Sequence, residues 1–256
     1  MGSWQARDDR RDDSSAACGS VSTGLAPLCE GVVEDAGVDG AALTLLTNSN
    51  RVRDLVYATD SLAQQLDDLQ FTLGEGPCLE AYQSHDTRLL ADLDSHPVNR
   101  WPTFVGEAIG LGARALFAFP VAAGGTPLAV LELYRRTAGE LSPRQHAAAT
   151  AAASAAGYTV TRNWHEYLST QGDYDDRVAT AAADMSHAQD HLTDRFSRSD
   201  VHLASGMVAA QLAVSADEGL DRLRAFSFRH ERSLKEVADD VVARRMNLRT
   251  LDLEDD

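Results

Sequence analysis

The sequence has little of several features that mark specialised classes of protein. It has only three cysteines, at positions 18, 29 and 78, without Cys-x-x-Cys spacing, so neither a disulfide framework nor a zinc site is predicted. No stretch approaches the roughly 20 apolar residues of a membrane span, and residues 1–17 lack the apolar core of a signal peptide. We therefore expect a cytoplasmic protein without membrane contact, metal or other cofactor.

Basic residues are also scarce. The chain has 23 Lys and Arg against 39 Asp and Glu, and its formal net charge of −16 repels polyanions as a whole. Lys235 stands alone among many arginines, as codon bias in a GC-rich genome would produce, which weakens any argument from arginine content. Yet residues 222–249 hold eight of the basic residues against four acids. This local excess indicates either a polyanion-binding surface or an Arg-rich helix face in solvent.

The length of 256 residues and a hydrophobic content of 44% allow a buried core. Residues 1–18 are charged and small, and we expect a disordered tail there. Residues 19–169 predict an α+β domain with a mostly antiparallel sheet, because β-type runs alternate with helical patterns. The expected strands lie within residues 39–47, 53–59, 87–93, 113–122 and 126–136.

Local signals mark the helices and turns of this domain. Helices are expected from near Val21, from Ser61 as a possible N-cap, and from Pro102 to a glycine at 110 or 112. Ser142 and Pro143 start a long alanine-rich helix that runs to about residue 169. A loop is expected at residues 72–78, and the glycines of AAGG, residues 122–125, predict a tight hairpin.

A helical linker is predicted for residues 170–199. Its apolar residues recur at helical spacing and continue into the next segment. This stripe predicts either a short coiled-coil seam between two protomers or a face packed against its own domain. Its members are Val178, Ala182, Met185, Leu192, Phe196 and Leu203.

Residues 200–256 predict a three-helix bundle. Ser215 with Glu218, and Ser233 with Glu236, form S-x-x-E capping boxes that begin two helices. The preceding helix is expected to pack through Val201, Leu203 and Met207. Arg222 and Arg229 lie seven residues apart and are expected to face solvent. The corner RHERSLK gathers cations near a helix N-terminus, where free backbone N–H groups favour a phosphate.

The segment from Val201 to Arg245 resembles an ANTAR domain, the RNA-binding antiterminator module. The residues that match its pattern are Ala204, Gly206, Ser215, Glu218, Leu223, Arg224, Arg232, Leu234, Val237 and Ala238. Ser205 departs from a frequent lysine, and Gly219 from the usual alanine, which should weaken its helix by roughly 1 kcal/mol. The resemblance and the charge pattern imply an RNA-binding set of Ala204, Ser205, Gly206, Arg222, Arg224, Arg229, His230, Arg232, Ser233 and Lys235.

The segments FTLGEGPCLEAY (71–82), WPTFVGEAIGLGARALFAFPV (101–121) and GGTPLAVLELYRR (124–136) resemble a GAF domain. That family comprises small-molecule sensors and dimerisation modules, although the N-K-x-F-D-E signature of its cyclic-nucleotide-binding members is missing. The resemblance implies a small-molecule pocket, for which the candidate lining residues are Phe71, Cys78, Trp101 and Phe119.

The two resemblances together imply a homodimeric, ligand-sensing transcription antiterminator that binds RNA hairpin loops in nascent transcripts. Two alternatives stay open: a ligand-responsive DNA-binding regulator, and a GAF-type thiol oxidoreductase that uses Cys78. His187 and His191 could begin a metal site, but a third ligand at fitting spacing is missing. No set of nucleophile, base and orienting acid is recognisable, so no enzyme is predicted. Phe228 lies off the apolar stripe and could stack on a base.

Overall fold

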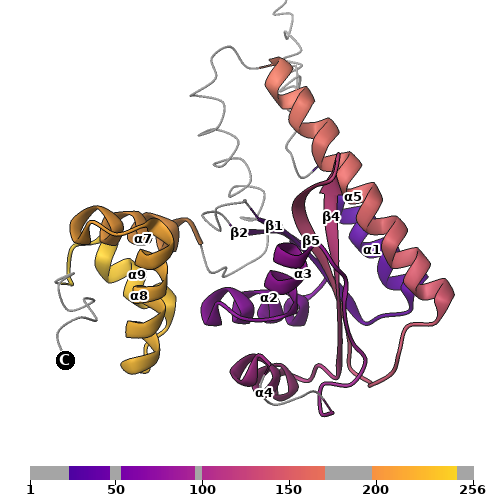
Figure 1. Ribbon diagram of the computed structural model, residues 1–256, viewed down its shortest axis with the longest axis horizontal. Coiled ribbons are helices and arrows are strands. Elements are labelled where there is room, and N and C mark those ends of the chain that lie inside the picture. The colour runs from indigo at the N-terminus through magenta and orange to yellow at the C-terminus, as the bar shows by residue number, and fades with distance from the viewer. Residues whose placement is uncertain (1–22, 47–52, 96–99, 171–197, 247–256) are drawn as a thin grey trace, which may run out of the picture.

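The computed structural model describes residues 23–46, 53–95, 100–170 and 198–246, and within them the chain forms a sheet domain followed by three helices (Figure 1). The sheet has five antiparallel strands in the order β2-β1-β5-β4-β3. The strands are β1 (Gly40–Leu46), β2 (Arg53–Ala58), β3 (Arg88–Leu90), β4 (Ala115–Ala123) and β5 (Thr126–Arg135). The predicted α+β class is confirmed.

Two layers of helices cover the two faces of the sheet. Helices α1 (Leu25–Ala36) and α5 (Pro143–Thr170) lie on one face, while α2 (Ser61–Leu73), α3 (Pro77–Ser84) and α4 (Pro102–Leu111) lie on the other. Alternation along β4 explains this arrangement: Phe117 and Phe119 enter the core under α1 and α5, and Leu116 enters the opposite core. Each face therefore has its own apolar core.

Most predicted elements of the sheet domain are present, with two corrections at their ends. The hairpin between β4 and β5 turns at Gly124 and Gly125, whose φ angles are 58° and 84°. Asp60, not Ser61, caps α2, because its carboxylate accepts a hydrogen bond from the Ala63 amide at 2.8 Å. The expected loop at residues 72–78 in fact contains the start of α3. None of the described helices is long and apolar enough to cross a membrane.

The segment GEGPC, Gly74–Cys78, ties the ends of three helices together. Gly74 ends α2 with a left-handed φ of 68°. The carboxylate of Glu75 accepts hydrogen bonds from the Thr103 and Phe104 amides at 3.1 and 2.9 Å, which caps the first turn of α4. Two residues further on, Pro77 occupies the first position of α3.

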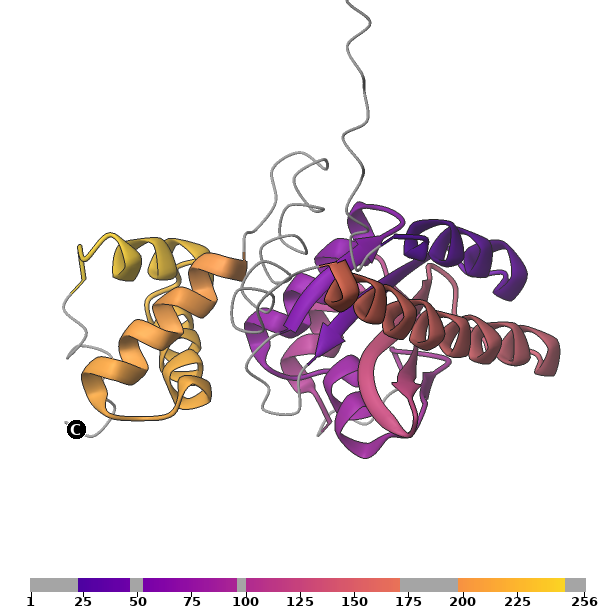
Figure 2. The same cartoon turned by 90° about the horizontal axis from the view of Figure 1, so that it is seen from above.

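The three-helix module, which is α7 (Arg198–Leu212), α8 (Ala216–Arg229) and α9 (Leu234–Val242), stands beside the sheet domain in Figures 1 and 2. Val201, Ala204, Val208, Leu223 and Val237 are among its core residues. The predicted bundle is present, and its last helix begins with the full capping box of Ser233 and Glu236. Of the predicted stripe, residues 178–196 lie outside the described residues.

Three predictions for the module are wrong. Leu203 was predicted to lie in the core but is 54% exposed, because Val201, Ala204 and Val208 form the inward face of α7. Arg222, expected in solvent, is buried, and its guanidinium donates to the Glu218 carboxylate at 2.8 Å. The predicted capping box at Ser215 is therefore incomplete. The Ser215 hydroxyl accepts from the Glu218 amide, but the Glu218 carboxylate pairs with Arg222 and does not cap the helix.

Gly219 is required where α8 crosses α7. A Cβ at this position would lie 2.6 Å from the Ser205 carbonyl oxygen and 3.3 Å from the Ala209 amide nitrogen. Both are backbone atoms, which cannot move aside without shifting a helix. The expectation that an alanine would strengthen this helix therefore omits the larger effect, which is the contact between the helices.

We predict opposite effects of alanine at two helical glycines of the module. Gly219→Ala should lower the free energy of unfolding by roughly 1–3 kcal/mol through overpacking. Gly206→Ala, in the middle of α7 with no atom within 4 Å of its Cβ, should raise it by about 1 kcal/mol through helix propensity. Urea denaturation of both variants checks the pair. A gain in stability for Gly219→Ala would contradict the proposed close approach.

Candidate nucleic-acid interface and the contact between the domains

The corner between α8 and α9 is held in one conformation by its own polar groups. The Ser227 hydroxyl donates to the Arg232 carbonyl oxygen at 2.5 Å, and the Arg232 amide donates back to the Ser227 carbonyl at 3.0 Å. Glu231 takes a left-handed φ of 51° in the turn. At the start of α9 the Ser233 hydroxyl accepts a hydrogen bond from the Glu236 amide, and the Glu236 carboxylate accepts one from the Ser233 amide. The side chains of this corner therefore project from a preorganised backbone.

Three residues at the end of α8 and just after it present large side chains to solvent. Phe228 is 78% exposed, and Arg229 and His230 are also exposed. The His230 ring rests against Phe226, with the ring centroids 4.0 Å apart. An aromatic ring, a guanidinium and an imidazole are thus exposed at three consecutive positions.

The other two cations of the corner are paired with acids of α9. The Arg232 guanidinium donates to the Asp240 carboxylate at 2.6 Å, and the Lys235 ammonium donates to Asp239 at 3.0 Å. Asp240 also accepts from Arg245 at 2.8 Å, and these hydrogen bonds lower the pKa of its carboxyl group. The acids orient the two cations and neutralise part of their charge.

The predicted RNA-binding residues of α7 and early α8 are mostly inside the module. Ala204 is a core residue, and Ser205 is buried with its hydroxyl donating to the Ala216 carbonyl oxygen at 2.5 Å. Arg222 is buried against Glu218, as described above. Gly206 alone of these four is exposed. The structure therefore does not bring the ten predicted residues onto one surface.

Arg224 points away from the corner and toward the sheet domain. Its Nε and Nη2 atoms donate to the Phe71 carbonyl oxygen at 3.1 and 2.6 Å, and Nη1 donates to Asp221 at 3.0 Å. The accepting carbonyl belongs to the last turn of α2, where carbonyl groups lack helical partners and the helix dipole favours a cation. A Cβ on Gly74 would lie 3.1 Å from Nη1, so this glycine leaves room for the guanidinium.

A buried charge cluster continues the contact between the two domains. Asp67 of α2 accepts from Thr44 at 2.7 Å, from Arg53 at 3.1 Å and from Arg198 of α7 at 2.5 Å. Arg198 also donates to Asp68 at 2.8 Å. Burial opposes ionisation of Asp67, but the two guanidinium groups and the Thr44 hydroxyl outweigh it and lower the pKa of this carboxyl group. Sequence reasoning missed this cluster.

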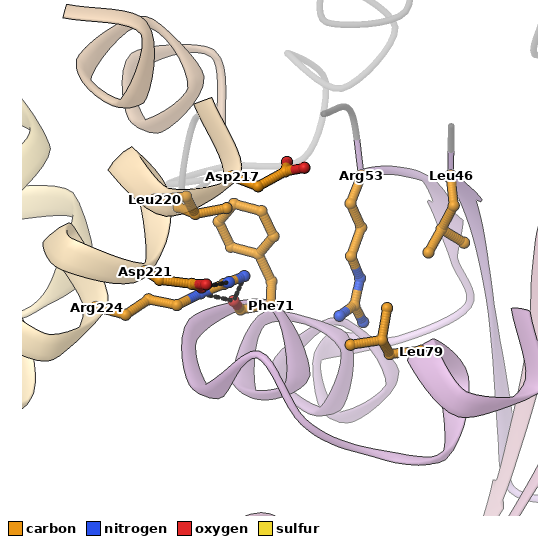
Figure 3. Close-up of a pocket in the computed structure, with 8 residues that line it drawn as sticks. All are labelled: Leu46, Arg53, Phe71, Leu79, Asp217, Leu220, Asp221 and Arg224. Atoms are coloured by element: carbon orange, nitrogen blue, oxygen red, sulfur yellow. Dashed lines mark hydrogen bonds and ion pairs between the residues drawn. The ribbon is translucent and has the colours of Figure 1, made fainter. Parts of the chain in front are cut away.

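A small pocket lies at the seam between the domains (Figure 3). It has a volume of about 80 Å³, and its walls come from β1, β2, α2 and α3 on one side and from α8 on the other. Arginines, aspartates and apolar side chains share the lining, which consists of Leu46, Arg53, Phe71, Leu79, Asp217, Leu220, Asp221 and Arg224.

The four residues predicted to line a ligand pocket do not share one. Phe71 is buried in the core of the three-helix module, and Cys78, on α3, is buried between that helix and the sheet. Phe119 lies on the opposite face of the sheet, under α1 and α5. Trp101 is half-buried beside α4, with the Arg100 guanidinium 4.7 Å from its ring centroid. Phe119 is the one strand residue of the four, and its position on β4 turns it to the face opposite α2, α3 and α4, which carry or adjoin the other three.

The thiol groups of the sheet domain are not arranged for redox chemistry. Cys29 and Cys78 are both buried, and each lies in a separate core. Burial raises the pKa of the Cys78 thiol, and burial with the Glu30 charge raises that of Cys29 to about 12. Thiolates are the reactive form, so both cysteines resemble structural thiols. His187 and His191 lie outside the described residues, which contain no group of three potential metal ligands.

Glu132 occupies the middle of β5 in a buried polar network. Its two carboxylate oxygens accept from the Gln70 side-chain amide at 2.9 and 2.8 Å, and the Gln70 carbonyl oxygen accepts from the Cys78 amide at 2.9 Å. A Cβ on Gly76, whose φ is 138°, would lie 2.4 Å from that same oxygen, so only glycine leaves room for the Gln70 side chain here. Burial raises the pKa of Glu132 to about 7.

Comparison with known families identifies both parts of the chain. A GAF-domain model matches residues 25–160, and an ANTAR-domain model matches residues 193–242. The predicted order of the two domains is therefore confirmed. No protein of curated function matches the sequence.

Several solved structures resemble the sheet domain. A domain named as a two-component sensor histidine kinase protein from Sinorhizobium meliloti 1021 is 17% identical, covering 57% of this chain and 94% of that one, with a TM-score of 0.46. The GAF domain of a Coxiella burnetii phosphoenolpyruvate-protein phosphotransferase is 16% identical, covering 57% and 85%, with a TM-score of 0.46. A type II free methionine-R-sulfoxide reductase from Thermoplasma acidophilum is 15% identical, covering 56% and 93%, with a TM-score of 0.39.

The raised pKa of Glu132 predicts a specific dependence of stability on pH. The folded pKa of about 7 lies above the ordinary pKa of 4.5 for a glutamate, so between these values the folded protein holds a proton that the unfolded chain has lost. The free energy of unfolding should therefore fall as pH rises through this window, by about 1.4 kcal/mol per pH unit, and level off above it. Glu132→Gln should remove that fall.

Urea denaturation between pH 5 and 8 measures the effect as a difference between the variant and the wild type. The matched control is Glu107→Gln, which removes an exposed carboxylate from α4 and should keep the wild-type slope. Equal slopes for the wild type and Glu132→Gln would contradict the assignment.

Proposed function

Because the chain belongs to the GAF family and carries an ANTAR domain after its GAF domain, we propose that it is a ligand-sensing transcription antiterminator. Both domains are regulatory. In this proposal the GAF domain responds to a small molecule, and the ANTAR domain, which is the three-helix module, binds an RNA hairpin loop in a nascent transcript. Holding the hairpin prevents a terminator from forming.

The exposed corner between α8 and α9 is the observation that carries the RNA-binding part of the proposal. In a chain of net charge −16, it gathers Arg229, His230, Arg232 and Lys235 beside the exposed ring of Phe228. Proteins read unpaired RNA bases by stacking them on aromatic rings or guanidinium planes, and position the strand through its phosphates. This corner offers both kinds of contact on a fixed backbone.

The surroundings of each cation suggest a division of work. Arg229 forms no ion pair among the described residues, so its guanidinium is available to stack on or hydrogen-bond a base. Arg232 and Lys235 are held by Asp240 and Asp239, which suits a fixed positive charge that meets a phosphate. Ser233 begins α9 between them, where the helix N-terminus adds partial positive charge.

A DNA-binding regulator is the second candidate, because a small helical bundle can also enter a major groove. The two candidates differ in their preferred competitor. A hairpin with an unpaired loop should displace duplex DNA of equal charge from the protein, since the stacking groups need unpaired bases. A preference for duplex DNA would favour the alternative.

A homodimer is part of the proposal and rests on the apolar stripe, whose seam residues Val178, Met185 and Leu192 lie outside the described residues. Leu192→Asp should place a carboxylate in that seam and dissociate the dimer, at a cost of several kcal/mol. Analytical ultracentrifugation checks this. A monomeric wild type would remove the dimer from the proposal.

Arg229→Ala is expected to weaken binding of a loop-bearing RNA hairpin about ten- to a hundredfold, because a charge-assisted contact at an interface contributes roughly 1–3 kcal/mol. The helical circular dichroism should stay unchanged, since this side chain is exposed. Arg144→Ala, which removes an exposed arginine from α5, is the charge-matched control and should bind as the wild type does. Unchanged affinity in Arg229→Ala would return the corner to an ordinary solvated face.

Arg232→Ala should behave differently from Arg229→Ala. The loss of a phosphate contact weakens all RNAs alike and flattens the dependence of the dissociation constant on salt, whereas the loss of a base contact removes preference for the loop sequence. Titrations of a cognate and a scrambled loop at several salt concentrations separate the two. Identical behaviour of both variants would contradict the assigned roles.

A further inference from the structure

We propose that the sheet domain holds the ANTAR domain in a docked state that withholds Arg224 from RNA, and that release of this contact is the regulated step. The inference rests on the function proposed above and adds its mechanism of control. The docking contact consists of Asp67, Asp68 and Phe71 on α2, and of Arg198 and Arg224 on α7 and α8.

The charged part of the docking contact pairs a buried arginine with two carboxylates of opposite charge. The Arg198 guanidinium bridges the carboxylates of Asp67 and Asp68 at 2.5 and 2.8 Å, with almost none of its side chain exposed. Its Nη1 atom donates to the Arg53 carbonyl oxygen at 3.3 Å. One arginine from the start of α7 is therefore recognised by three groups of the sheet domain, which fixes how the ANTAR domain sits.

Among the described residues, the apolar part of the contact is the ring of Phe71, which reaches from one domain into the other. Phe71 belongs to α2, yet it is buried with Val201, Ala204 and Leu220 in the core of the ANTAR domain. The Arg198 guanidinium lies 4.5 Å from its ring centroid and that of Arg224 lies 5.6 Å away. Removal of this ring would take an anchor from the docked state. It would not remove a member from any of the apolar clusters of the sheet domain.

Arg224 cannot serve RNA while it is docked. Each of its three guanidinium nitrogens already donates a hydrogen bond, two to the Phe71 carbonyl and one to Asp221. Only 19% of its side chain is exposed. Arg224 is also one of the residues that match the ANTAR pattern, whereas the corner around Arg229 stays exposed in the docked state. Docking therefore leaves the RNA surface accessible but incomplete.

The contact has the properties of one that can open. The domains meet through long side chains, and a small pocket lies at their seam (Figure 3). Two buried nitrogens near the seam, Arg53 Nε and His202 Nε2, find no hydrogen-bond partner among the described residues. Orphaned donors and buried ion pairs both carry desolvation costs, which are recovered when water returns. These costs lower the net stability of the docked state, so in this proposal a ligand that binds the released state more tightly shifts the populations toward it.

The test compares full-length variants altered only on the sheet-domain side, so that no ANTAR residue changes. Phe71→Ala removes the anchoring ring, and Asp68→Asn removes one of the two carboxylates that hold Arg198. Leu89→Ala, an exposed apolar residue of β3, and Asp86→Asn, an exposed acid after α3, are the matched controls. Small-angle X-ray scattering measures the radius of gyration, and titration with a loop-bearing RNA hairpin measures affinity.

We expect Phe71→Ala to expand the chain and to raise hairpin affinity on the order of tenfold, within the usual range of coupling between sites. Asp68→Asn should act in the same direction but less, because Asp67 still holds Arg198. The controls should match the wild type. An unchanged radius in Phe71→Ala, or an expanded chain with unchanged or weaker RNA binding, would overturn the inference. If no form binds RNA, the proposed function fails, and scattering alone then supports or overturns the docking contact.

Discussion

The buried carboxylate of Asp67 is the interaction on which the arrangement of this protein depends. It joins β1 through Thr44, β2 through Arg53, its own helix α2, and α7 through Arg198. Two guanidinium groups face two carboxylates, Asp67 and its neighbour Asp68, so the charges balance inside the seam. Removal of one partner from such a group typically costs about 3–5 kcal/mol, because the remaining charge stays buried without compensation. The Asp67 carboxylate thus stabilises the sheet domain and also fixes the position of the ANTAR domain.

The contact between the two domains joins residues that are far apart in the sequence. Helix α5, the last element of the sheet domain in sequence, covers one face of the sheet, whereas the ANTAR domain rests on α2, which covers the other (Figure 1). The partners Arg198 and Asp67 are 131 residues apart, and Arg224 and Phe71 are 153 apart. The sensing and output parts therefore meet at a specific face, chosen by side-chain complementarity.

The sequence predicted what local rules determine and missed what distant partners determine. The β4–β5 hairpin, the cap at Ser233 and the apolar spacing of α9 depend on residues within one or two turns, so they were predictable. Arg222 was predicted to face solvent and Arg224 to bind RNA, and only the distant or local partners Glu218 and the end of α2 explain where their side chains point. One signal was available: Asp67 directly follows Leu66 on the apolar side of α2, which is an unusual place for an acid without a partner.

The Gly74–Cys78 segment has a mechanical consequence. Within it, Gly74 ends α2 beside Arg224, Glu75 holds the first turn of α4, and Pro77 starts α3. Short links with several anchored atoms transmit displacement, because no spare backbone is available to absorb it. A shift of α3 or α4 against the sheet would therefore displace the end of α2, including the Phe71 carbonyl that accepts hydrogen bonds from Arg224. In this protein a five-residue segment, Gly74–Cys78, therefore couples α3 and α4 to the contact with the ANTAR domain.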